Sequence, residues 1–350
     1  MPDCSAQRGR AVFELIDRPG RLAGVRLVQE IGLAGPLEFA RTRGSWRLEV
    51  DLPDVRRMEY LFEIRDRHGA RMTVLDPANP RRAAGAFGEK SVLELAGYAP
   101  PAWLARTPIE GVHSSSQLAA PDLDGGVDLT LWAPLDLAPE LPAPLLVVHD
   151  GPEYARLGSF VQYLAASIAT GELPPLRAAL LDPGNRNAWY SANPGYAQTL
   201  TDVVLPALDA TVATTVRIGV GASLGALAML HVHRSYPDRL DGLLLQSGSF
   251  FTPELDPQES SFSGFATVTE FVAETHGTRA DGRAVPAVLT CGTVEENLAN
   301  NRLMAATLHR LGYPGHIVTV PDAHNYTAWR DALDPHLTVL VSDVVGARAT

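Results

Sequence analysis

The sequence predicts an α/β domain with a mostly parallel sheet, preceded by an all-β sandwich of about a hundred residues. In the first part of the chain, apolar residues alternate with polar ones, which is typical of half-buried antiparallel strands. Further on, short uninterrupted apolar runs alternate with helical stretches, which is typical of a parallel sheet covered by helices. The length of 350 residues accommodates two domains.

The first domain is expected over residues 1–105 and consists of short strands. In the run SWRLEVDLP, the apolar Trp46, Leu48 and Val50 alternate with charged residues, so one face of this strand is expected to be buried. The runs EYLFEI and RMTVLD flank a His-Gly turn, which predicts a hairpin. DPANP interrupts the pattern because proline cannot donate to a β-ladder, and SVLEL predicts one more strand. Several short strands at this spacing predict a β-sandwich.

Residues 106–126 have the composition of a linker, with Pro108, a serine run and a Gly-Gly pair, and with one strand inside. The second domain is expected over residues 127–350. After VDLTLWAP, buried strands are predicted at LLVVHD, AALLD, VRIGVGAS, GLLLQSGS, AVLTCGT and HIVTVPDA. Helical stretches such as ALAMLHVHRSYP and LANNRLMAATLHRLG lie between them, and this alternation predicts a layered α/β domain with right-handed crossovers.

The composition excludes several classes of protein. With 46% hydrophobic and 20% charged residues, the chain can form a packed core, which excludes a disordered protein. The formal net charge of -11 gives no general attraction for nucleic acid or an anionic membrane, so neither is expected as a partner. The sequence has no transmembrane run, and its first residues lack the pattern of a secretory signal, so a cytoplasmic location is expected. The cysteines lack zinc-site spacing, and we expect no metal and no cofactor.

The most informative motif is Gly221-Ala222-Ser223-Leu224-Gly225, which lies between a β-branched run and a helical run. A sharp strand-to-helix turn of this kind raises a serine hydroxyl above the edge of the sheet, and its glycines permit close approach of neighbouring backbone. The following helix would offer its N-terminal dipole and the Leu224 amide to a developing oxyanion. The alternative is a glycine-rich turn with an incidental serine. We interpret Ser223 as a candidate nucleophile.

A nucleophilic serine needs a base and an orienting acid, and in this layout the acid and then the histidine follow the serine along the chain. CGTVEEN places Glu295 and Glu296 at the end of one strand, and PDAHNYTAW places His324 at the end of the next. The carboxyl ends of strands are where such sheets gather their ligands. We interpret His324 as the base and Glu295 as the orienting acid. Glu296 would then favour the first turn of the following helix, and the reverse assignment of the two glutamates stays open.

An oxyanion hole needs a second amide donor, usually from the loop after the third strand, and that loop reads HDGPEY. Because Pro152 has no N–H, the donor must be the amide of Gly151, Glu153 or Tyr154. We expect Gly151, since glycine permits unusual backbone angles.

These stretches resemble a known family, the enterochelin (enterobactin) esterases and their esterase relatives, which are themselves similar to feruloyl esterases and mycolyltransferases. The resemblance runs through WRLEVDLP, EYLFEI, DPANP, LLVVHDGPEY, RNAWYSANPGYAQTLTDVVLPALD, the serine motif, YPDRLDGLLLQSGSFF, CGTVEENLANNRLMAATL and DAHNYTAWRDAL, nearly the whole chain. It implies an α/β-hydrolase catalytic domain preceded by an immunoglobulin-like sandwich. It also implies Ser223 as the nucleophile, His324 as the base and Glu295 as the third member.

The chain departs from the family pattern in two places. Asp322 and Ala323 stand where the family usually has Gly-Gly before the histidine, and Asn325 stands where it usually has aspartate. Pro152 follows the Asp-Gly pair of the predicted oxyanion loop. The chemistry of both loops is therefore left open by the resemblance.

Three further residues are candidates for substrate contact. Arg186 matches an arginine that is common in the family, and it is expected either to contact an anionic or catechol-like substrate or to hold its own loop by a salt bridge. Tyr190 and Trp329 could stack on an aromatic acyl group, although aromatic residues near strand ends more often belong to the core.

These residues predict a serine carboxylesterase that forms an acyl-enzyme and then hydrolyses it with water. The resemblance implies a small-molecule ester as the partner, with a siderophore trilactone, in ferric or iron-free form, as the leading substrate for iron release. The alternatives are an esterase on acylated carbohydrates or other small esters, an acyltransferase, and a non-catalytic binding protein.

Overall fold

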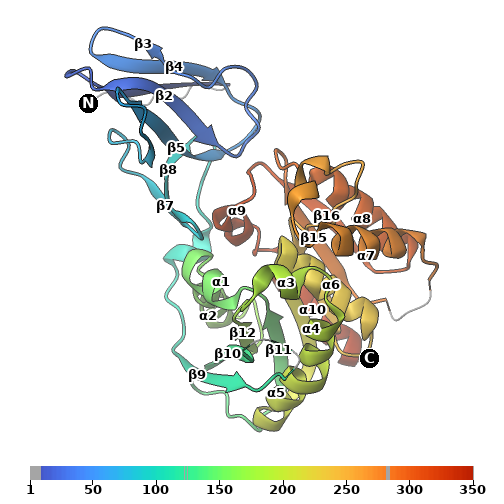
Figure 1. The fold of residues 1–350 in the computed structure, drawn as a ribbon. Helices are drawn as coiled ribbons and strands as arrows, with labels where there is room; N and C mark the ends of the chain where they lie inside the picture. The colour runs from blue at the N-terminus through green and yellow to red at the C-terminus, as the bar shows by residue number, and fades with distance from the viewer. Residues whose placement is uncertain (1–8, 122, 124, 281–283, 350) are drawn as a thin grey trace. The chain divides into compact units, whose positions relative to one another are not determined.

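The computed structural model describes residues 9–121, 123, 125–280 and 284–349, and the chain divides into two compact units (Figure 1). The first unit contains Met1–Pro100 and two short segments from later in the chain, Gly292–Glu295 and Val320–Ala328. The second contains Pro101–Cys291, Glu296–Thr319 and Trp329–Thr350. An all-β region followed by an α/β domain confirms the predicted fold class, while the exact domain boundaries stay a prediction.

Two antiparallel sheets make up the β-structure of the first unit. One sheet has the strand order β1, β4, β3, and the other has the order β2, β5, β8, β7, with β6 paired to β5. In β4, Trp46, Leu48 and Val50 are buried, as their alternation with charged residues predicts. The strands are β1 (Arg10–Ile16), β2 (Leu22–Gln29), β3 (Ala40–Arg41), β4 (Ser45–Asp51), β5 (Arg57–Asp66), β6 (Arg71–Val74), β7 (Arg82–Gly85) and β8 (Gly88–Glu94).

The core of the first unit lies between these two sheets. Phe13 of β1 and Phe62 of β5 meet edge to face with their ring centroids 6.3 Å apart, a geometry that aromatic pairs favour. Two residues of the later segments, Val294 and Ala323, pack on the same core. The loops that contain the predicted acid and base therefore fold as part of this unit.

An eight-stranded sheet forms the centre of the second unit, in the order β16, β15, β14, β13, β11, β12, β10, β9. The strands from β12 through β11, β13 and β14 to β15 are parallel, whereas β10 runs antiparallel to both of its neighbours. Every residue of β11 is buried, which suits a central parallel strand. The strands are β9 (Gly111–Leu118), β10 (Val127–Pro134), β11 (Ala143–Val148), β12 (Arg177–Leu181), β13 (Thr214–Ala222), β14 (Gly242–Gln246), β15 (Ala287–Gly292) and β16 (Gly315–Val320).

Helices follow most strands of this sheet, as the sequence predicts (Figure 1). Both α6 and α10 pack against β13 and β14. Among the described helices, none combines the length and apolar character that crossing a bilayer requires. The helices are α1 (Gly151–Leu157), α2 (Phe160–Ala169), α3 (Arg186–Tyr190), α4 (Pro194–Thr199), α5 (Leu205–Thr211), α6 (Leu224–Ser235), α7 (Phe265–Gly277), α8 (Leu298–Arg310), α9 (Tyr326–Asp331) and α10 (His336–Ala349).

Candidate active site

Ser223 occupies a sharp turn between the end of β13 and the start of α6. Its backbone angles are φ 55° and ψ -127°, a conformation that residues with a side chain rarely adopt and that is found at functional sites. The surrounding backbone holds this conformation: the Ser223 N–H donates to the Gln246 carbonyl at 2.9 Å, and the Ser249 N–H donates to the Ser223 carbonyl at 3.2 Å. The serine motif is therefore a nucleophile elbow in its geometry.

A second serine lies against the first. The Ser249 Oγ is 3.2 Å from the Ser223 Oγ, and Ser249 is only 2% exposed. Sequence reasoning missed Ser249, because its proximity to Ser223 arises from the pairing of β13 with β14, and nothing local marks it. A hydrogen bond at this distance would restrict the rotation of the Ser223 hydroxyl and so pre-organise the predicted nucleophile.

Gly221→Ala is expected to lower the free energy of unfolding by about 1–3 kcal/mol or more, through overpacking. A Cβ at Gly221 would lie 2.4 Å from the Gly225 carbonyl oxygen and 2.5 Å from the carbonyl carbon, and neither backbone atom can move aside without opening the elbow. Urea unfolding monitored by circular dichroism measures the effect. The matched control is Gly346→Ala in α10, where no atom lies within 4 Å of the position that the new methyl group would take, and alanine should stabilise the helix by up to about 1 kcal/mol. Equal stability of the two variants would contradict the steric argument.

The backbone amides of two helix starts are candidate oxyanion donors. Leu224 is the first residue of α6 and Gly151 the first residue of α1, and amides in the first turn lack intrahelical acceptors. Among the alternatives to Gly151, the Tyr154 N–H donates to the Asp150 carbonyl at 2.9 Å, and the Glu153 N–H bonds to its own carboxylate. The hydrogen bonding thus favours Gly151 of the three amides in that loop.

Arg186 forms a salt bridge with Asp150, the residue that precedes Gly151. Asp150 has a left-handed backbone, with φ 51° and ψ 36°, and its carboxylate accepts two hydrogen bonds from the guanidinium. Arg186 Nε lies 2.7 Å from Asp150 Oδ1, and Arg186 Nη2 lies 2.9 Å from Asp150 Oδ2. This bidentate pair is the loop-holding geometry that was one of the two interpretations of Arg186. The arginine side chain also keeps 34% exposure, so its predicted contact with a substrate stays a prediction.

The two aromatic candidates for substrate contact are buried. Tyr190 is fully buried and stacks on His149 with ring centroids 4.5 Å apart. Trp329 is 7% exposed, and its Nε1 donates to the Ser247 hydroxyl at 2.9 Å. Both rings are part of the packing of the second unit, and their contact with an acyl group stays a prediction.

His149, directly after β11, hydrogen-bonds to the backbone of the serine elbow. Its Nδ1 lies 2.9 Å from the Gly225 carbonyl oxygen and its Nε2 lies 2.8 Å from the Tyr196 hydroxyl. Because a carbonyl only accepts, Nδ1 carries the proton and Nε2 accepts from the tyrosine. Burial lowers the pKa of His149 to about 4, so the ring is neutral near pH 7 and its hydrogen bonds are fixed. Sequence reasoning missed this role as well.

This buried histidine makes stability depend on pH. The pKa of His149 is lowered from 6.5 in the unfolded chain to about 4 in the folded one, so below pH 6.5 the unfolded chain binds a proton that the folded chain excludes. The unfolding free energy should therefore fall as the pH drops from 7 toward 4, with His149 contributing about 2 kcal/mol of the loss by pH 5. Urea unfolding at both pH values measures this. His149→Gln should remove this share of the dependence, leaving that of the other histidines whose pKa is lowered by burial, such as His231, and the exposed-site control His68→Gln should not. An unchanged slope in His149→Gln would rule out the assignment.

The predicted acid and base form a hydrogen-bonded pair in the first unit. Glu295 follows β15 and His324 follows β16, and His324 Nδ1 lies 2.8 Å from Glu295 Oε2. The other carboxylate oxygen, Glu295 Oε1, accepts the Gly292 N–H at 2.7 Å. A carboxylate accepts only, so Nδ1 carries a proton, and Nε2 is the ring nitrogen that would act as the predicted base. The neighbouring Glu296 is exposed, and its Oε2 lies 3.4 Å from Gln258 Nε2.

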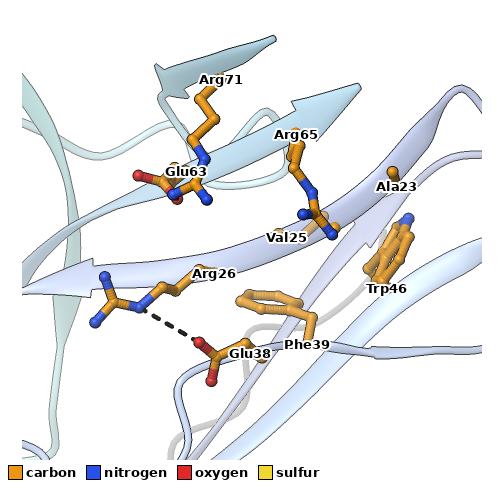
Figure 2. A pocket seen from close by; sticks show the side chains of 10 residues that line it. Ala23, Val25, Arg26, Glu38, Phe39, Trp46, Glu63, Arg65 and Arg71 are labelled. Carbon is orange, nitrogen blue, oxygen red and sulfur yellow. Dashed lines mark hydrogen bonds and ion pairs between the residues drawn. The ribbon is translucent and has the colours of Figure 1, made fainter. Parts of the chain in front are cut away.

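A separate hollow of about 410 Å³ lies on the sandwich of the first unit (Figure 2). Its wall includes the aromatic residues Phe39 and Trp46. Two ion pairs line it, with Arg26 Nε 3.6 Å from Glu38 Oε1 and Arg71 Nη1 3.3 Å from Glu63 Oε1. The remaining lining residues are Ala23, Gly24, Val25 and Arg65. None of the predicted catalytic residues lines this hollow. Elsewhere, within the described ranges, no group of three or more His, Cys, Asp or Glu side chains is arranged to hold a metal ion.

A mostly parallel sheet with a strained serine at a strand-to-helix elbow, preceded by a β-sandwich, defines an α/β-hydrolase with an N-terminal sandwich. The chain belongs to the esterase family described as "Putative esterase", whose model matches residues 123–340. The resemblance found in the sequence is thereby confirmed.

Several known esterases are similar to this chain in sequence or in fold. An iron(III) enterobactin esterase of Dickeya dadantii (strain 3937) is 28% identical over 206 residues, which are 54% of this chain and 46% of that protein, so the match spans about half the length of this curated relative. The ferric enterobactin esterase from Salmonella typhimurium superposes with a TM-score of 0.79 at 21% identity, covering 96% of this chain and 94% of that chain. The enterobactin esterase from Shigella flexneri, solved in the presence of enterobactin, gives a TM-score of 0.75 at 19% identity, covering 98% and 97%. A ferulic acid esterase gives 0.57 at 19% identity, covering 67% and 99%.

Proposed function

We propose that this chain is a serine carboxylesterase that opens a cyclic catecholate trilactone of the enterobactin type. The observation that carries the proposal is the Glu295–His324 pair at 2.8 Å, which follows an elbow serine in the chain order expected of this fold. The relatives supply the substrate class, since the Dickeya protein is named an iron(III) enterobactin esterase and the Shigella enzyme was solved with enterobactin.

The first half of the reaction forms the acyl-enzyme. The Ser223 hydroxyl attacks the ester carbonyl carbon while its proton passes to His324 Nε2. The negative charge moves onto the carbonyl oxygen, where the amides of Leu224 and Gly151 donate to it. Glu295 holds the imidazole in the reactive tautomer and stabilises the imidazolium that forms. The ester C–O bond then breaks, and the leaving alcohol oxygen takes the proton back from His324.

The second half releases the acid. A water molecule gives one proton to His324 Nε2 and attacks the acyl carbon, and the bond to the Ser223 oxygen breaks as that oxygen regains a proton. For a trilactone, the first such cycle opens the ring, and further cycles cut the linear ester. Arg186, fixed by Asp150 but still partly exposed, is the proposed contact for an anionic catecholate.

Product analysis by mass spectrometry tests the proposal. Purified protein is mixed with the iron-loaded and the iron-free trilactone, and Ser223→Ala is the control. Serine-dependent linear and monomeric hydroxy-acids are expected, together with serine-dependent hydrolysis of a generic aryl acetate. If the aryl acetate is cleaved while both trilactone forms persist, the esterase stands and the substrate class is wrong. In that case acylated sugars are assayed next. If neither ester is cleaved, the catalytic proposal itself is wrong.

A further inference from the structure

A buried arginine of the sandwich lies beside the loop of the predicted base. Arg57 is the first residue of β5 and is 2% exposed. An arginine is rarely buried to this extent unless its charge is paired. Sequence reasoning did not single out Arg57, because the partners that pair it lie far along the chain.

Three side chains accept hydrogen bonds from the guanidinium, and the centroid of the Tyr98 ring lies 6.0 Å from its Cζ. Nη2 of Arg57 donates to Glu59 Oε1 at 2.9 Å, and Nη1 donates to Asn325 Oδ1 at 3.0 Å and lies 3.4 Å from Asp322 Oδ2. Nη2 thus binds a residue of the sandwich strand β5, and Nη1 binds Asp322 and Asn325 in the loop that contains His324. Only arginine has a planar group with enough donors to make all three contacts at once.

Asp322 and Asn325 also form hydrogen bonds within the loop that contains His324. The carboxylate Oδ1 of Asp322 accepts the Ala323 N–H at 2.7 Å and the Asn325 Nδ2 at 3.1 Å, and Asn325 Oδ1 accepts the Ala328 N–H at 2.9 Å. The main chain adds one more tie to the sandwich, because the Arg56 N–H donates to the Pro321 carbonyl at 2.9 Å. Asp322 and Asn325 are two of the positions where the chain departs from the Gly-Gly and aspartate usual in the family.

The buried charge of Arg57 is compensated by the carboxylates beside it. Burial alone would lower the pKa of Arg57, but the carboxylates of Asp322 and Glu59 more than offset it and raise the pKa, so the guanidinium stays charged. Burial raises the pKa of Asp322, and Arg57 offsets part of that rise. Lys90, the sole lysine of the chain, pairs with Glu30, and its Nζ also lies 3.8 Å from Glu59 Oε2.

We propose that Arg57 is a positioning residue for the general base: by holding Asp322 and Asn325, it fixes the orientation of His324 toward Glu295. The proposal rests on the function proposed above. Such support matters for His324 because its side chain is 35% exposed. Displacing a catalytic group by about 1 Å can lower a rate on the order of 100-fold, even when the change is remote from the chemistry.

The test compares Arg57→Lys with Arg177→Lys. Arg177 is a matched control: it is 1% exposed and its guanidinium also makes several hydrogen bonds, but these go to the backbone carbonyls of Ala138, Leu141 and Ala213 around the start of β12. Two readouts are recorded at a temperature where all variants are folded by circular dichroism. They are kcat and KM for an aryl acetate, and the far-downfield proton resonance of the His324 Nδ1–H, assigned by its loss in His324→Gln.

Arg57→Lys is expected to lower kcat by roughly 10- to 100-fold with little change in KM and to broaden or abolish the downfield resonance. Arg177→Lys should keep both. If Arg57→Lys does not fold, Asn325→Ala, which removes one of the two loop contacts and leaves Arg57 paired with Glu59, should show the same losses to a smaller degree. An unchanged resonance and kcat in the Arg57 variant, or equal losses in the Arg177 variant, would overturn the proposal. If the wild type cleaves no ester, the proposed function fails, but the resonance still decides whether Arg57 orients His324.

Discussion

Ser223→Ala is expected to lower kcat for ester hydrolysis by on the order of 10⁵- to 10⁶-fold, the loss found when a nucleophilic serine acting with its base is removed. Alanine cannot form the acyl-enzyme, so only the oxyanion donors and substrate binding remain to accelerate attack by water. Steady-state hydrolysis of an aryl acetate measures the loss, and a fluorophosphonate probe that labels only the wild type checks it independently.

The control for this variant is Ser249→Ala, which removes the hydroxyl 3.2 Å from the Ser223 Oγ but leaves the nucleophile. Loss of one orienting contact should reduce kcat by no more than roughly 10²-fold. If Ser223→Ala retained activity comparable to that of Ser249→Ala, the elbow serine would not be the nucleophile.

Glu295→Gln is expected to lower kcat by on the order of 10⁴-fold, because an amide can donate to Nδ1 and so stabilise the wrong tautomer of His324. The neighbouring Glu296 provides a matched control of the same chemistry one residue away. Glu296 is exposed, and its carboxylate accepts a hydrogen bond from Gln258 at 3.4 Å. Glu296→Gln should therefore change kcat little. The two variants are compared in the same aryl acetate assay across pH 6 to 9. A large loss in Glu296→Gln with full activity in Glu295→Gln would reverse the assignment of the acid.

Strands that bury one face were predictable from the sequence. The alternation of Trp46, Leu48 and Val50 with charged residues predicts β4, and the structure buries all three. β1 (Arg10–Ile16) was not predicted, because Val12 and Ile16 are apolar on the face opposite its buried residues and blur the period of two. The short strands β3 and β7 follow from pairing with their neighbours and leave little local pattern to read.

The candidate site divides in the same way. The elbow at Ser223 and the strand-end positions of Glu295 and His324 were predictable, since a strand-to-helix turn and two strand ends are local patterns. The catalytic roles of these residues stay predictions. The sequence could not decide between Glu295 and Glu296 as the partner of His324, because the turn after β15 determines where each side chain points. The structure pairs Glu295 with His324 and leaves Glu296 exposed.

The residues that hold these groups in place left no local signal. His149 reaches the Gly225 carbonyl across 76 residues, and Ser249 reaches Ser223 across 26. Asp150 adopts a left-handed backbone that non-glycine residues seldom take, and its pairing with Arg186 stabilises that loop. These hydrogen bonds and ion pairs join residues far apart in the sequence, so neither hydrophobic periodicity nor a local motif predicts them.

Arg57 and Asp322 are 265 positions apart in the sequence, so the first unit can be completed only late in synthesis. During synthesis, the first hundred residues emerge long before the loop that completes their compact unit. Until then the nascent sandwich contains Arg57 without its partners Asp322 and Asn325, and its core lacks Ala323. Closing so long a loop costs conformational entropy and slows folding, so the loop that contains His324, the predicted base, is expected to join the sandwich late. A ribosome-bound or truncated chain that ends before residue 320 would contain the serine elbow but lack His324, the predicted base, so it should hydrolyse no aryl acetate.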